Sequence, residues 1–154
     1  LILVTWSGMT MLSALGARFL PDRVSARQWV IVSLFGCGLG QFLLIGIGGD
    51  SSWMIVLPGL FIAGVSNGIL NASLGHEAVQ TVPADRSAMG SAANNTARYL
   101  GSALGIAMIS IMIANMQGEA FFTGWHEAVI VTVGFSLLGA ASMIFLSKRS
   151  VSEA

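Results

Sequence analysis

The sequence predicts an all-α protein, a polytopic bundle of transmembrane helices. Three observations support this fold class: the composition, the lengths of the apolar runs and the placement of the basic residues. Apolar residues make up 55% of the chain and charged residues only 9%, whereas a soluble domain usually carries roughly a quarter charged residues. Such a composition cannot cover a water-exposed surface, so lipid must be the solvent for much of the chain. The lipid bilayer is therefore the first expected partner.

Five apolar runs are separated by short polar links. A helix needs about 20 apolar residues to cross about 30 Å of hydrocarbon, and four of the runs reach or approach that length. The expected spans cover about residues 1–15, 29–47, 53–74, 92–116 and 128–146, the apolar part of the fourth being 99–116. The first run is short because the chain begins inside it. We therefore expect this chain to be the carboxy-terminal piece of a longer protein.

The basic residues all fall on one side of this five-span arrangement. They are Arg18, Arg23 and Arg27 in the first link, Arg86 and Arg98 in the third, and Lys148 and Arg149 in the tail. Because Lys and Arg mark cytoplasmic loops, we expect the amino end outside and the carboxyl end in the cytoplasm. The protein is then a multi-pass protein of the plasma membrane. Its net charge of zero argues against a nucleic-acid partner.

The first link, residues 16–27, forms a compact charged turn between two spans. Gly16 ends the first run, and Asp22, Arg23 and Arg27 follow it. The Asp22 carboxylate can accept hydrogen bonds from the free N–H groups of the next helix and pair with a nearby arginine. We call this expected arrangement of Asp22, Arg23 and Arg27 the clasp, and it would hold two spans together until a conformational change breaks it. The alternative is a basic loop that only sets the topology.

The segment before the fourth span places five residues on one helical face. They are Gly90, Asn94, Arg98, Gly101 and Gly105, at spacings of four, four, three and four. The small residues suit close packing on a neighbouring helix, and Arg98 falls at the cytoplasmic rim. There it can pair with Asp85, with Glu77 or with a carboxylate outside this chain. A structural role for Arg98 competes with substrate contact.

Polar side chains also occur inside the expected spans. Asn67 and Asn71, four residues apart, share one face of the third span, and Gln41 lies in the second. Amides at membrane depth face the bundle interior or a watery cavity, so these residues either line a substrate path or form interhelical hydrogen bonds. No acidic residue lies within a span, although Glu77 comes close. If transport is coupled to protons, its carboxylate is expected upstream of Leu1.

Two segments carry a resemblance to a known family. Residues 16–27 resemble the loop signature of the major facilitator superfamily, in which a glycine precedes Asp-Arg and a further basic residue. The family's second glycine is replaced here by Ser25 or Ala26. Residues 82–107 resemble the loop and helix start before the penultimate span of the fourteen-span drug:proton antiporters. The matching residues are Val82-Pro83, Arg86, Asn94-Asn95-Thr96-Ala97-Arg98 and Leu100-Gly101 with Leu104-Gly105, while Ser87 replaces the usual glycine.

This resemblance implies the last five spans of a major facilitator fold and a function in transport. The implied activity is proton-coupled efflux of drugs or other hydrophobic or cationic small molecules by alternating access. The implied partners are a small-molecule substrate, protons and the missing amino-terminal half of the transporter. Another solute, such as a sugar or a metabolite, is the first alternative, and a non-transporting membrane scaffold is the second. We find no pattern of an enzyme, so no catalytic residue, cofactor or metal is expected.

Overall fold

The computed structural model describes residues 2–21, 23–45, 47–48, 52–114, 116 and 119–152. Within these residues the chain forms five α-helices and two single-turn 3-10 helices. The α-helices are α1 (Ile2–Gly16), α2 (Ala26–Phe42), α3 (Trp53–Gln80), α4 (Ser87–Ile113) and α5 (Glu119–Ser152), with η1 (Ala17–Phe19) after α1 and η2 (Ala84–Arg86) before α4. The described residues contain no strand. The predicted all-α class is therefore confirmed.

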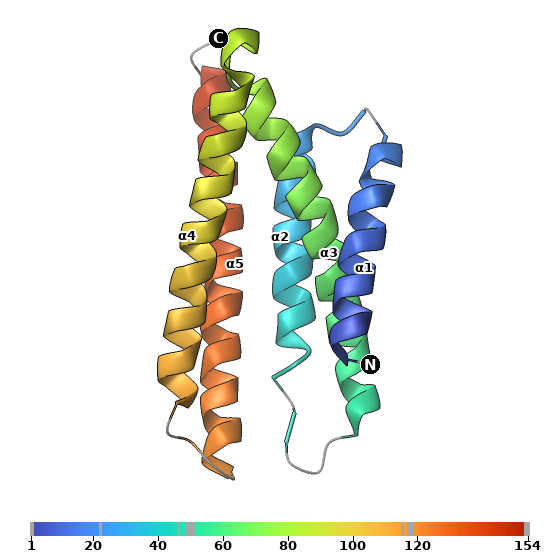
Figure 1. The fold of residues 1–154 in the computed structure, drawn as a ribbon, viewed down its shortest axis with the longest axis vertical. Coiled ribbons are helices and arrows are strands. Elements are labelled where there is room, and N and C mark those ends of the chain that lie inside the picture. The colour runs from blue at the N-terminus through green and yellow to red at the C-terminus, as the bar shows by residue number, and fades with distance from the viewer. Residues whose placement is uncertain are drawn as a thin grey trace.

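Successive helices run in opposite directions along the bundle (Figure 1). α3 lies at its centre, where it packs extensively against α1 and α2, and α2 packs in turn against α5. α4 makes fewer contacts, with α3 and α5. α1 and α3 end, and α2 and α4 begin, at the end of the bundle that is uppermost in Figure 1.

Helix bounds and expected membrane limits do not coincide. Within the described residues, three helical segments are long and apolar enough to cross a membrane: Met54–Gln80, Ala84–Ile113 and Ala120–Phe145. α1 and α2 have 15 and 17 residues, or about 23 and 26 Å of helix. α3 continues past residue 74, the expected limit of its span, through the polar residues His76, Glu77 and Gln80. Backbone hydrogen bonding does not stop at a membrane surface, so the span limits stay predictions.

The outer surface of the bundle is apolar. Large side chains such as Leu12, Ile111 and Phe145 are 62%, 79% and 69% exposed. Small side chains dominate the interior, where Val30, Ala63 and Ala140 are buried. An apolar exterior around a small-residue interior is what helices packed in lipid require.

Glycines bring α2 close to α3, and α3 close to α1. A Cβ built on Gly40 would lie 2.5 Å from the Ala63 nitrogen and 2.8 Å from the Gly59 carbonyl oxygen, both on α3. A Cβ on Gly64 of α3 would lie 2.9 Å from the carbonyl oxygen of Trp6 on α1. The glycines therefore allow backbone-to-backbone contact in the half of the bundle made by α1, α2 and α3.

Candidate functional site at the arginine-rich end

The described arginines gather toward one end of the bundle, which we call the arginine-rich end. It comprises η1, the start of α2, the last turns of α3, η2 and the first half of α4. The arginines whose side chains the structure describes are Arg18, Arg23, Arg27, Arg86 and Arg98. Most of the residues that the sequence predicts to act in gating also lie at this end.

An ion pair connects α2 to α3 at this end. Arg27 Nε lies 3.7 Å from Glu77 Oε1, and the two side chains are 29% and 21% exposed. The capping box of α2 fixes the start of the helix, because the Gln28 N–H donates to Ser25 Oγ and the Ser25 N–H donates to Gln28 Oε1. Arg27 Nε is buried without a hydrogen-bond partner in the described part of the chain. The pair is therefore an ionic contact, not a hydrogen bond.

The predicted clasp is only partly visible. Asp22 lies outside the described residues, so its bonds to a helix or an arginine stay a prediction. Arg23 is exposed, and Arg27 faces Glu77. Gly16 precedes η1, and nothing described lies within 4 Å of a Cβ built on it. Glu77, which was expected only as a partner of Arg98, is thus the acidic partner that the structure gives to Arg27.

α3 and α4 approach closely at Gly90. A Cβ on Gly90 would collide with the Ala78 carbonyl oxygen and would lie 3.0 Å from Val82 Cγ2. A groove of about 380 Å³ follows this contact, with Glu77 and Asn94 among its lining residues. Pro83 and Arg86 hold the turn before α4, because the Arg86 N–H donates to the Pro83 carbonyl oxygen at 2.8 Å.

A chain of polar groups joins α4 to α3 further along. Arg98 Nη1 donates to Asn71 Oδ1 at 2.9 Å. The Asn71 amide nitrogen donates to the Asn67 carbonyl oxygen at 2.8 Å and lies 3.3 Å from Asn67 Oδ1. Of the two roles open for the asparagines, the structure shows an interhelical hydrogen bond for Asn71. Whether Asn67 and Asn71 also line a substrate path stays a prediction.

The sequence predicted Asp85 or Glu77 as the partner of Arg98 within this chain, and this prediction was wrong. Asp85 instead lies 3.9 Å from Arg86 Nε, in a pair whose side chains are 77% and 66% exposed. Such exposed pairs contribute little to stability. Glu77 is already engaged by Arg27. Arg98 reaches Asn71 because the two residues lie on the facing sides of α4 and α3, and an amide oxygen serves as an acceptor there.

The small-residue face of α4 is packed at only one end. Gly90 is in contact with α3, but nothing described lies within 4 Å of a Cβ built on Gly101 or Gly105. The neighbouring Leu100 and Leu104 are 60% and 66% exposed. This open part of α4 is therefore free to meet lipid or another helix.

Gln41 and Cys37 lie away from the contacts at the arginine-rich end. The Gln41 side-chain oxygen is buried and has no hydrogen-bond partner in the described part of the chain, and its predicted place in a cavity stays a prediction. Cys37 is buried and free. Among the described residues, no three His, Cys, Asp or Glu side chains are grouped to hold a metal ion.

Comparison with known proteins identifies the family. The profile of the Major Facilitator Superfamily matches residues 1–106, and the chain therefore belongs to this superfamily of membrane transporters. It is also 26% identical, over 140 residues, to a protein named "Uncharacterized transporter YebQ" from Escherichia coli (strain K12). That match covers 91% of this chain and 30% of the relative's length. No solved structure matches the chain significantly.

Proposed function

We propose that the intact protein exports hydrophobic or cationic small molecules in exchange for protons, by alternating access. Family membership supports transport, and the resemblance of residues 82–107 to fourteen-span drug:proton antiporters supports this substrate class. The remaining spans, including the proton-binding carboxylate, belong to the part of the transporter upstream of Leu1. The protein lies in the plasma membrane with its arginine-rich end in the cytoplasm, because basic residues concentrate on that side.

The observation that carries the mechanism is the unequal attachment of α4. At the arginine-rich end it is held by the Gly90 contact and by the Arg98–Asn71 hydrogen bond, while Gly101 and Gly105 face open space. The far end of α4 also packs on α5, where a Cβ on Gly124 would lie 3.2 Å from the Met112 carbonyl oxygen. A helix with a polar, breakable bond to α3 and an open glycine face can still change its contacts with α3 during a transport cycle. We assign the open face to contact with the amino-terminal half, and in this proposal rocking of the two halves around a central site alternates access.

The direct test measures uptake of a cationic dye into inside-out membrane vesicles that contain the intact protein. Respiration acidifies the vesicle interior, so an antiporter should accumulate the dye and release protons, and a protonophore should abolish accumulation. Uptake of a sugar or metabolite instead of the dye would replace the proposed substrate class. Failure to move any solute would favour a membrane scaffold.

A charge reversal tests the clasp separately. Asp22→Lys should abolish dye uptake while the protein remains inserted in the membrane, because the lysine repels the arginines of the same link. Asp85→Lys is the matched control, since its carboxylate is exposed in the other arginine-bearing link. Full activity of Asp22→Lys would remove the clasp from the mechanism, and equal loss in both variants would point to a general effect of loop charge.

A further inference from the structure

Arg98 lies between α3 and α4 without a negatively charged partner among the described residues. Its exposed guanidinium donates from Nη1 to Asn71 Oδ1 at 2.9 Å and lies 5.7 Å from the ring centre of Tyr99. The ion pairs in the described part of the chain use other arginines, Arg27 and Arg86. An arginine side chain stays charged and carries several N–H donors. Arg98 can therefore bind a further group that is anionic and accepts hydrogen bonds.

Asn71 is held in a position that orients Arg98. Its amide nitrogen donates to the Asn67 carbonyl oxygen at 2.8 Å and lies 3.3 Å from Asn67 Oδ1. These contacts within α3 leave the Asn71 side-chain oxygen to accept from Arg98 on α4. A charged group that is positioned before its ligand arrives binds that ligand at a lower entropic cost. The pair is thus an organised site rather than an isolated surface charge.

Space for a small molecule lies beside this pair. The lining of the groove of about 380 Å³ between α3 and α4 includes Leu74, about one turn after Asn71, and Ala97, the neighbour of Arg98. Alanine, leucine and valine side chains supply most of that lining, and its acidic member, Glu77, forms the ion pair to α2. The volume falls in the range of small-molecule sites, roughly 300–1,000 Å³. The groove offers apolar walls next to a guanidinium.

We propose that Arg98 and Asn71 recognise a carboxylate on the transported compound, while the apolar groove takes its hydrophobic part. The carboxylate accepts from the N–H groups of Arg98 that Asn71 leaves free, and arginine suits the planar shape of a carboxylate. This inference rests on the proposed export function and names a chemical group of the substrate. Hydrophobic acids and zwitterions are then bound more tightly than their esters.

The experiment measures equilibrium binding of a matched pair of fluorescent dyes to the intact transporter, purified in detergent. Rhodamine B carries a carboxylate and a delocalised cation, and its ethyl ester keeps the cation but not the carboxylate. Fluorescence polarisation should show tighter binding of the acid than of the ester. Arg98→Gln should weaken binding of the acid by about tenfold, because it removes a charge-assisted contact, and should leave binding of the ester unchanged.

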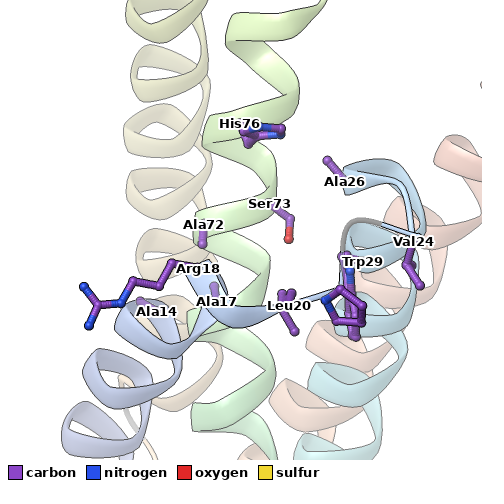
Figure 2. Close-up of a pocket in the computed structure, with 11 residues that line it drawn as sticks. Ala14, Ala17, Arg18, Leu20, Val24, Ala26, Trp29, Ala72, Ser73 and His76 are labelled. Atoms are coloured by element: carbon purple, nitrogen blue, oxygen red, sulfur yellow. The ribbon is translucent and has the colours of Figure 1, made fainter.

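Arg18→Gln is the matched control, since it removes the same charge at the same end of the bundle. The Arg18 guanidinium points away from Ser73 and Trp29 (Figure 2). The described residues give it a contact with the Phe19 ring, at 4.8 Å, but no hydrogen bond. Arg18→Gln should therefore bind the acid as the unmodified protein does. Equal loss in Arg18→Gln and Arg98→Gln would overturn the proposal, because general positive charge would then attract the acid.

Asn71→Asp tests the site without removing the arginine. Its carboxylate would replace the amide beside Arg98 and compete with the dye, so binding of the acid should fall by a similar factor while binding of the ester does not. Equal binding of acid and ester by the unmodified protein would overturn the proposal. So would an affinity for the acid that Arg98→Gln leaves unchanged, and Arg98 would then have a structural role.

Failure of the proposed function would look different. If the acid binds through Arg98 but neither dye accumulates in energised vesicles, the recognition site is supported and proton-driven export of these compounds is not. If the ester accumulates and the acid neither binds more tightly nor depends on Arg98, export is supported and the carboxylate site is overturned.

Discussion

Replacement of Gly40 by alanine should destabilise the contact between α2 and α3. The added Cβ would lie 2.5 Å from the nitrogen and 2.9 Å from the Cα of Ala63, and 2.8 Å from the Gly59 carbonyl oxygen. These are backbone atoms of α3, which cannot rotate away as a side chain can. Because a relaxed carbon contact is about 3.5–4.0 Å, the helices must separate locally by about 1 Å.

Overpacking of this kind costs about 1–3 kcal/mol. At roughly 2–4 °C per kcal/mol for a domain of this size, the thermal midpoint of the purified intact protein should fall by several degrees. Gly134→Ala in α5 is the matched control, since nothing described lies within 4 Å of its added Cβ. A Gly40→Ala midpoint equal to that of Gly134→Ala would refute the close approach of α2 and α3.

Three further perturbations test the contacts between helices. A double-mutant cycle with Arg98→Ala and Asn71→Leu should give a coupling of about 0.5–1.5 kcal/mol in thermal unfolding; additive effects would mean that the bond at 2.9 Å is not formed in the membrane protein. Arg27→Glu and Glu77→Arg should each lower the free energy of unfolding by about 1 kcal/mol, and the double variant, in which the two charges are exchanged, should recover part of that loss. No recovery would show that the 3.7 Å contact contributes nothing to stability. Trp125→Phe should lower the thermal midpoint slightly by removing the bond that holds the end of α2 to α5, and an unchanged midpoint would count against that bond.

The helical class and the direction of each helix could be predicted from the sequence. Hydropathy identifies an apolar run because burial in lipid depends on composition and length, not on the neighbours of a run. The one-sided placement of the basic residues then orders the helices as an alternating set. Figure 1 shows that alternation directly.

Partners across helices could not be predicted in the same way. Arg98 and Asn71 are 27 residues apart, and their contact depends on how α3 and α4 are rotated about their axes. Hydropathy is nearly uniform around these helices, so it does not report that rotation. The same limit applies to glycines: Gly36 and Gly40 look like Gly101 and Gly105 in sequence, but only the first pair is packed against a neighbour.

The Arg98–Asn71 bond also bears on how the chain enters the bilayer during synthesis. Arginine at the centre of an inserting helix costs about 2.5–3.5 kcal/mol. Arg98 lies at the cytoplasmic rim of the expected fourth span, where the cost is smaller. α3 leaves the ribosome before α4, so Asn71 can already be in the membrane when Arg98 arrives. The substitution Asn71→Leu in α3 should therefore lower the efficiency with which α4 inserts into the membrane. Glycosylation of a reporter site engineered after α4 measures this efficiency. Equal insertion in the Asn71→Leu variant and the unmodified chain would show that α4 inserts without the Arg98–Asn71 bond.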